Sequence, residues 1–267
     1  MAERATAIPA AMRQLSAYWD RVGLAPSDRV YAEFQARRYP HVLEFWLARG
    51  SLAGKRVLDL GGGIGGLSVA MSSALGGEYE LAEYRRPTEA HLAIAKEFGL
   101  RGAYEVDLSR PDPLAALETG YDLVLFVEVL EHLLVNPRTL FRQIATRLRR
   151  PGYVFVTTPN QARLTNRYRL AMGRSIRERD SFPASAAGPF GHVAEYTIPD
   201  LEDLLGREGW ALEAATVVQN PPTPPGIAVR MQSRRGLRRV GIGLLDRPFF
   251  RRLRLGDEIQ ALFRIDR

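Results

Sequence analysis

The chain has 267 residues, of which 46% are hydrophobic, with a formal net charge of +7 and no cysteine. This length suits one α/β domain with additions at its ends, and the apolar content is ample for a core. The lack of cysteine excludes disulfides and thiolate metal sites. No apolar run approaches the ~20 residues that span a bilayer, and residues 1–9 lack the basic-then-apolar pattern of a secretion signal. A cytoplasmic location is therefore expected.

The positive charge is concentrated in two segments. Residues 142–179 carry ten arginines against one glutamate, and residues 230–254 carry nine arginines against one aspartate. The genome's base composition can account for a general preference for arginine over lysine, but not for this clustering. The two clusters predict contact with an anionic partner, such as a phosphorylated substrate, a nucleic acid or an acidic membrane surface. The alternative is that both are basic faces exposed to solvent.

Two helices are predicted before the first strand, over residues of about 10–22 and 28–49. From there to residue 158, short apolar runs alternate with helical patterns, which is typical of a parallel, doubly wound sheet. Residues 161–191 break this alternation. An insertion at this point follows the fifth strand and lies at the carboxyl edge of the sheet, where ligands bind, so we expect a lid.

The last part of the chain predicts a helix followed by two strands. Residues 197–208 form the helix, with Thr197 as its N-cap. Residues 210–219 and 258–265 form the strands. Between them lie a proline-rich link at 220–226 and a basic insertion at 226–256, for which an extra packed helix or a segment lying on a membrane surface are both conceivable.

The most informative stretch is the glycine-rich segment after the first strand. The apolar run 56–60 contains Asp59 and is followed by five glycines within residues 61–66 and then by an apolar helix start. A strand, a tight turn and a helix allow backbone to approach a nucleotide-like ligand closely. The segment also fits the dinucleotide pattern G-x-G-x-x-G, which alone is weak. A carboxylate just before the glycines favours a ligand that carries an ammonium group over a pyrophosphate.

Residues 57–65 resemble motif I of class I S-adenosylmethionine-dependent methyltransferases, in the form D-x-G-x-G-x-G. Strands ending near Glu83, Asp107 and Glu128 follow at the family's spacing, and the similarity spans residues of about 50–210. A nicotinamide oxidoreductase is the rival interpretation. Its Tyr-x-x-x-Lys pair is absent, because neither Lys55 nor Lys96 has a tyrosine four residues before it.

The resemblance implies a Rossmann-like, seven-stranded, mostly parallel sheet with an antiparallel last strand. It implies a helical cover over residues 1–50 and a methyltransferase domain over 51–267, with the lid at 161–191. S-adenosylmethionine is the implied cofactor, with Glu83 at the ribose hydroxyls and Asp107 at the adenine amino group. Arg37 or Arg38 either reaches the methionine carboxylate or belongs to a solvated arginine face, and the solvated face is the favoured interpretation. The implied cofactor-binding residues are Asp59, Gly61, Gly63, Gly65, Glu83, Tyr84, Asp107, Leu108 and Glu128.

Glu128, Glu131 and His132 are spaced i, i+3 and i+4, so a helical turn would direct all three the same way. The pattern is similar to Glu-x-x-Glu-His in the small-RNA terminal ribose and ubiquinone-pathway O-methyltransferases. The small-RNA group completes a metal site with a later histidine, which corresponds to His192. This predicts Mg²⁺, Mn²⁺ or Zn²⁺ on these four residues. Without metal, His192 or His132 would be the catalytic base, or Glu131 and His132 would only form local hydrogen bonds.

The resemblance as a whole implies O-methylation of a sugar, a glycan precursor or another small hydroxylated metabolite, as in bacterial glycan and secondary metabolism. An arginine-rich lid suits an acceptor that bears phosphate. RNA ribose methylation and N-methylation are the alternatives, and a cofactor-binding partner subunit without activity is a third. The basic segments contain few aromatic residues to stack on bases, which disfavours nucleic acid. Acceptor identity and oligomeric state stay open.

Overall fold

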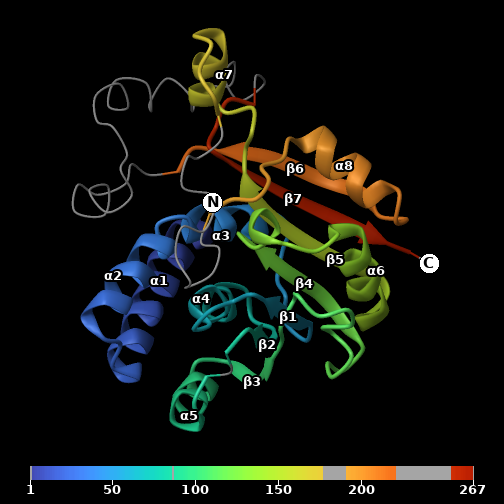
Figure 1. Ribbon diagram of the computed structural model, residues 1–267. Coiled ribbons are helices and arrows are strands. Elements are labelled where there is room, and N and C mark those ends of the chain that lie inside the picture. Colours follow the sequence, from blue (N-terminus) through green and yellow to red (C-terminus); the bar gives the residue numbers. More distant parts are fainter. Residues whose placement is uncertain (1, 86, 177–190, 221–253, 267) are drawn as a thin grey trace.

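The computed structural model describes residues 2–85, 87–176, 191–220 and 254–266. A seven-stranded sheet of order β3-β2-β1-β4-β5-β7-β6 forms its centre (Figure 1). The strands are β1 (Arg56–Leu60), β2 (Glu78–Glu83), β3 (Leu100–Glu105), β4 (Tyr121–Val127), β5 (Leu148–Pro159), β6 (Ala211–Val218) and β7 (Glu258–Ile265). β7 runs antiparallel to both of its neighbours, whereas the pairs among β1 to β5 are parallel. The predicted sheet is confirmed.

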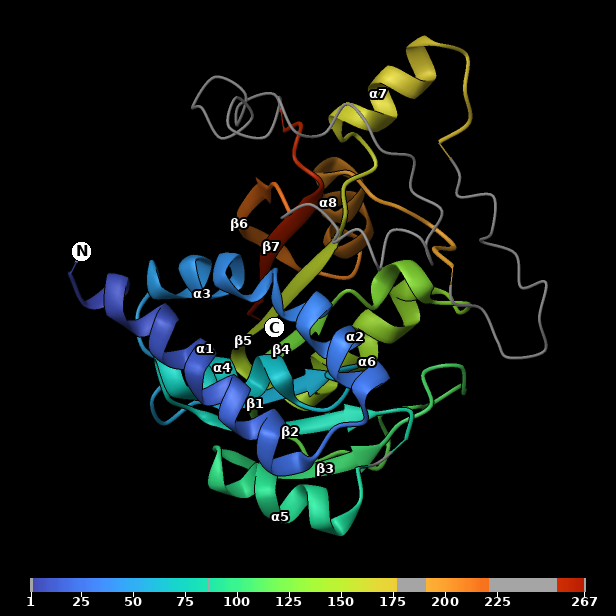
Figure 2. The same cartoon turned by 90° about the vertical axis from the view of Figure 1, so that its left-hand side faces the viewer.

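Helices cover both faces of the sheet (Figures 1 and 2). One core cluster joins the sheet to the first five helices, which are α1 (Ala2–Val22), α2 (Pro26–Ala36), α3 (Tyr39–Leu47), α4 (Gly66–Leu75) and α5 (Glu89–Glu97). The other cluster joins it to α6 (Pro137–Arg147) and α8 (Ile198–Gly206). Helix α7 (Leu164–Ala171) stands off the sheet beyond the end of β5. Within the described residues, no helix is long and apolar enough to cross a membrane.

The order of the strands in the sheet indicates where a ligand would bind. The chain moves outward from β1 to β3 and then returns to β4 on the other side of β1. In doubly wound sheets, ligands bind at the carboxyl ends of the strands where this direction reverses. The ends of β1 and β4 carry the glycine-rich turn and the Glu-x-x-Glu-His segment, so both motifs lie at this crevice.

The N-terminal region contains three helices where the sequence predicted two. The predicted second helix is divided at Arg37 and Arg38, and a new helix begins at Tyr39 with Pro40 in its first turn. Proline lacks an N–H and its ring disfavours a helical residue before it, so it begins helices more readily than it continues them. The first helix also begins earlier than predicted, at Ala2, and accommodates Pro9.

The later elements lie close to their predicted ranges. β3 ends at Glu105, two residues earlier than predicted, although the backbone N–H of Val106 still donates to the Glu83 carbonyl. Thr197 caps α8 as expected, in a reciprocal capping box with Asp200. Residues 177–190 of the lid and 221–253 of the link and basic insertion lie outside the described residues.

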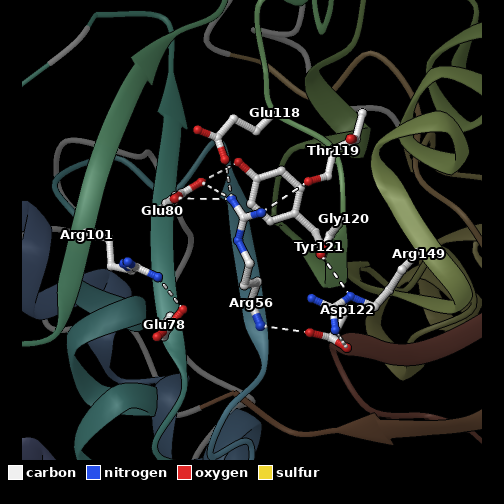
Figure 3. Close-up of polar contacts among 10 residues, drawn as sticks. All are labelled: Arg56, Glu78, Glu80, Arg101, Glu118, Thr119, Gly120, Tyr121, Asp122 and Arg149. Atoms are coloured by element: carbon white, nitrogen blue, oxygen red, sulfur yellow. Dashed lines mark hydrogen bonds and ion pairs between the residues drawn. The ribbon is translucent and has the colours of Figure 1, made fainter.

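A charged cluster lies at the amino ends of the strands, opposite the ligand crevice (Figure 3). Arg56, at the start of β1, donates to the Thr119 carbonyl at 3.1 Å and to the Glu118 carboxylate at 2.6 Å. Its guanidinium lies 4.8 Å from the centre of the Tyr121 ring. These contacts tie the starts of β1 and β4 together, far from the ligand crevice.

We therefore expect Arg56→Ala to lower the free energy of unfolding by about 1–3 kcal/mol, because it removes several hydrogen bonds and a ring contact. Urea unfolding would measure this. The control is Arg101→Ala, whose exposed ion pair with Glu78 should contribute less than about 1 kcal/mol. Equal losses in the two variants would contradict a structural role for the Arg56 cluster.

Candidate active site

The glycine-rich turn joins β1 to α4 with three glycines in the left-handed region, at φ +85° for Gly61, +59° for Gly63 and +79° for Gly65. A Cβ on Gly61 would lie 2.4 Å from a Val129 methyl group, and one on Gly65 would lie 2.8 Å from the Leu100 side chain. A Cβ on Gly63 would meet no atom within 4 Å. Conformation and close packing thus both require glycine at Gly61 and Gly65, while the backbone of Gly63 has open space beside it.

Asp59 lies beneath this turn. Its side chain is 1% exposed and accepts a hydrogen bond of 2.7 Å from Ser68 at the start of α4. Burial raises its pKa to about 7, and the Ser68 hydrogen bond opposes that shift. A Cβ on Gly62 would lie 2.5 Å from the Asp59 carboxylate. The structure therefore places Asp59 as a support under the turn, and its contact with a cofactor ammonium stays a prediction.

Glu83 lies beside the turn at the end of β2. Its carboxylate accepts hydrogen bonds from the backbone N–H of Gly63 at 2.8 Å and of Tyr84 at 2.9 Å. These bonds fix the acid next to the glycines, where a ribose would be gripped. Contact of Glu83 and Tyr84 with the cofactor stays a prediction.

Asp107 follows β3 at the same edge. Hydrogen bonds from the Ser109 hydroxyl and backbone N–H lower the pKa of the Asp107 carboxyl. Tyr84 and Asp107 face a common open pocket of about 470 Å³, which Glu105 and Pro113 also line. Leu108 is partly buried against the core. The structure thus brings the predicted ribose and adenine positions to one edge of the sheet.

The segment after β4 differs from the predicted helical turn. Glu128 has a φ of +56°, and only Leu130–His132 form a short 3-10 helix (η1). Glu128 is therefore not aligned with Glu131 and His132. Its carboxylate accepts a hydrogen bond of 2.9 Å from Thr157 and lies 2.5 Å from the Arg38 guanidinium. Arg38 also lies 3.8 Å from Glu258, so two carboxylates engage it.

Three of the four predicted metal ligands come together. Glu131, His132 and His192 offer ligand atoms that all lie within 4.8 Å of one another, and Glu128 is outside this group. The Glu131 side chain is 1% exposed. Its Oε2 accepts a hydrogen bond of 3.2 Å from Thr158, while its Oε1 is buried without a hydrogen-bond partner. A buried carboxylate oxygen without a partner is costly, so this position fits a cation.

A second layer of contacts orients both histidines. Nδ1 of His132 lies 3.2 Å from the Gly191 carbonyl, which can only accept, so Nδ1 carries the proton and Nε2 holds the lone pair. Nδ1 of His192 lies 3.4 Å from the Glu195 carboxylate. Such partners on the far nitrogen are typical of metal-binding histidines. The donor set of one carboxylate and two imidazoles suits Zn²⁺ or Mn²⁺.

The segment that carries His192 is anchored to the strand ends. The backbone N–H of Val193 donates to the Glu131 carbonyl at 2.7 Å, and Tyr196 forms a bridge with Asn160 after β5. At the start of helix α7, the Arg163 guanidinium lies 2.9 Å from the Glu195 carboxylate. The Asn166 amide donates to the same carboxylate at 3.1 Å. Helix α7, at the beginning of the predicted lid, is therefore connected to the histidine group through Glu195.

The pKa values of the two glutamates beside the histidines, Glu131 and Glu195, are shifted in opposite directions. Burial raises the pKa of Glu131 well above its usual value, and the neighbouring charge of Glu128 raises it further, while Arg38 opposes both. Burial opposes the lowered pKa of Glu195, but hydrogen bonds from His192 and Arg163 outweigh it. Glu195 thus presents a negative charge to His192.

Two residues of this region, Glu195 and Arg163, were not predicted from the sequence to support the histidines. Glu195 stands three residues after His192, and this spacing was the available signal. The pairing of Arg163 with Glu195 depends on tertiary packing, so no local pattern could have indicated it.

The sheet order, the glycine turn and the acids at successive strand ends define a class I S-adenosylmethionine-dependent methyltransferase. The chain belongs to the methyltransferase-domain family, whose model matches residues 31–215. S-adenosylmethionine is the cofactor of this class, and a neighbour in the same fold holds its product S-adenosylhomocysteine. The predicted class, cofactor and fold are confirmed.

Among known proteins, the chain is similar to a ubiquinone biosynthesis O-methyltransferase of Bordetella pertussis, with 38% identity over 117 residues, 42% of this chain and 46% of that protein. The chain spans about half the length of the curated relatives it matches. Its fold is shared with a methyltransferase bound to a Haloferax volcanii methyltransferase activator (TM-score 0.56, 14% identity, 89% and 94% of the two chains). It is also shared with the Burkholderia thailandensis 1,6-didemethyltoxoflavin-N1-methyltransferase (TM-score 0.54, 16% identity, 96% and 87%).

Proposed function

We propose that the protein transfers a methyl group from S-adenosylmethionine to a hydroxyl oxygen of a small hydroxylated metabolite. The observation that carries this proposal is the grouping of Glu131, His132 and His192 beside the cofactor crevice. A hydroxyl is a weak nucleophile near neutral pH and needs a group that removes or stabilises its proton, whereas a neutral amine needs less help. The curated relatives are named O-methyltransferases, which supports oxygen as the atom that is methylated.

Glu131, His132 and His192 would hold a divalent metal in this site. The metal would supply a Lewis acid that lowers the pKa of an acceptor hydroxyl. Glu195 and the Gly191 carbonyl orient the two imidazoles, and Thr158 holds the second oxygen of Glu131. Arg38 keeps Glu128 outside the group, which leaves three protein ligands and room for acceptor oxygens. This is the usual division in catalytic metal sites.

Without a metal, His192 would act as the general base. Its Nδ1 faces the Glu195 carboxylate, which stabilises the imidazolium that forms when Nε2 takes a proton. His132 would then hold the acceptor hydroxyl. In either case the chain's contribution is to orient the hydroxyl toward the methyl group in a near-attack geometry.

The acceptor we propose is a sugar, a glycan precursor or another polyol, with phosphate as an additional recognition group. Helix α7 at the start of the lid supports this. Arg163 is engaged by Glu195 and Arg167 donates to the Ala162 carbonyl, while the exposed Arg169 and Arg174 extend the basic surface beyond them. Guanidinium groups pair with phosphate oxygens in a bidentate manner.

The test is a panel of acceptors presented to the purified protein with S-adenosylmethionine and Mg²⁺, Mn²⁺ or Zn²⁺. The panel contains vicinal diols, single alcohols and amines, each with and without a phosphate, and mass spectrometry identifies the methylated atom. The proposal expects methylated hydroxyls, with vicinal diols preferred. Methylation of amines alone would favour N-methylation instead, and methylation of RNA ribose with no small acceptor modified would favour the RNA alternative. Cofactor binding without any transfer would favour a non-catalytic subunit.

A further inference from the structure

Helix α1 reaches the glycine-rich turn through Tyr18. The Tyr18 side chain is completely buried, and its hydroxyl donates to the Ile64 carbonyl at 2.6 Å. The same hydroxyl lies 2.5 Å from Nε2 of His91 on α5. The ring packs against Phe98 with 5.3 Å between ring centres. One side chain therefore connects three elements that are far apart in the sequence.

The protons of this contact can be assigned. A carbonyl only accepts, so the single Tyr18 proton points to Ile64. The hydroxyl must then accept from His91, which places a proton on Nε2 of that ring. Burial lowers the pKa of His91, which is consistent with a neutral ring that donates from Nε2, while a hydrogen bond between this ring and the Ile64 backbone opposes the shift. Tyr18 is therefore held between a donor and an acceptor and has one orientation.

The Ile64 carbonyl lies within the glycine-rich turn, between Gly63 and Gly65, which both have a positive φ. The rest of the turn is fixed from its other side: Gly61 donates to the Ala82 carbonyl at 2.7 Å, Gly63 to Glu83 at 2.8 Å and Gly65 to the Gly62 carbonyl at 2.9 Å. A peptide plane directs its C=O and N–H in opposite directions. When Tyr18 holds the Ile64 carbonyl, the Gly65 N–H is directed into the turn.

We propose that Tyr18, oriented by His91, is a positioning residue for the cofactor: it holds the glycine-rich turn in the form that binds S-adenosylmethionine. This inference rests on the cofactor of the chain and not on the acceptor or the metal. Helix α1 lies before residue 31, where the match to the family model begins. Leu15 and Tyr39 pack beside Gly66 and hold the same N-terminal helices on α4.

The test is calorimetric titration of S-adenosylhomocysteine into Tyr18→Phe. The ring and its packing remain, and only the hydroxyl is lost. The matched control is Tyr79→Phe, since Tyr79 is also buried and its hydroxyl donates to the Gly76 carbonyl at 3.1 Å, at the far end of α4. Tyr18→Phe loses two hydrogen bonds and Tyr79→Phe loses one, so both variants should lose thermal stability, and Tyr18→Phe should lose more. Only Tyr18→Phe should bind the ligand about tenfold more weakly, the factor expected for one hydrogen bond.

A second variant, His91→Phe, removes the donor from the opposite side of the Tyr18 hydroxyl and should weaken binding in the same direction. Affinities of Tyr18→Phe and His91→Phe within twofold of the wild type would overturn the proposal. A loss of affinity in Tyr79→Phe equal to that in Tyr18→Phe would also overturn it, because the effect would then be general destabilisation. These results are independent of methyl transfer, so they are separate from the outcome of the acceptor panel.

Discussion

Gly61→Ala is expected to weaken binding of S-adenosylhomocysteine about 100-fold. The new Cβ would lie 2.4 Å from a Val129 methyl group at a residue with a φ of +85°. A left-handed conformation costs a non-glycine residue about 1–2 kcal/mol and overpacking costs about 1–3 kcal/mol more. The turn relieves this strain by moving away from Val129, and the cofactor surface moves with it. Isothermal titration would measure the affinity.

Gly54→Ala is the matched control for this prediction. Gly54 also has a positive φ, of +72°, but a Cβ there would meet no atom within 4 Å and the residue precedes β1, at the other edge of the sheet. This variant should lose about 1 kcal/mol of stability and keep its affinity for the ligand. If Gly61→Ala binds as tightly as Gly54→Ala, the turn is not the cofactor site.

Glu131→Gln is expected to lower the turnover number at least about 100-fold. The substitution keeps the shape of the side chain but replaces the carboxyl group that faces the two histidines with an amide, which cannot ionise and is a weaker metal ligand. Substitution of groups that only orient metal ligands already costs about 10–100-fold, so on the proposed metal site the loss of Glu131 as a ligand should cost at least as much. Initial rates with the best acceptor of the panel, at saturating cofactor, would measure the effect.

Two variants calibrate this result. Glu195→Gln, which changes the partner of His192 and of Arg163 but no proposed metal ligand, should lose about tenfold. Glu44→Gln removes an exposed carboxylate far along α3 and should have no effect. A Glu131→Gln enzyme within fivefold of the wild type would show that the Glu131 carboxylate takes no part in the reaction.

Much of the fold was predictable from the sequence because its signals are local. The strand at 258–265 has the bounds that its alternating pattern indicated, and a strand ends at Glu83 as the resemblance implied. The glycine turn specifies its own conformation. The predicted order of strands and helices also determined the sheet, because parallel strands with helical connections allow few topologies. Errors occurred where one residue overrides a pattern, as Pro40 does between α2 and α3.

The residues of the candidate site could be predicted from the sequence, but which of them lie together could not. The strand ends brought Glu83, Asp107 and the Glu131 region to one edge, as expected. The prediction that Glu128 joins Glu131 and His132 required a helical turn, and the left-handed conformation of Glu128 prevents it. Arg38 then engages Glu128, a contact between residues 90 positions apart in the sequence that no spacing rule could indicate.

The measurement that tests the central claim most directly is calorimetric titration of Mn²⁺ and Zn²⁺ into metal-stripped protein saturated with S-adenosylhomocysteine. The three-residue site predicts one ion per chain, binding that is lost in His192→Ala, and binding retained in His41→Ala, whose histidine lies outside the group. Glu128→Gln should also retain it, because Arg38 and Thr157 already hold that carboxylate. No binding to the wild type, or equal binding to His192→Ala, would contradict the metal site and leave His192 as the general base.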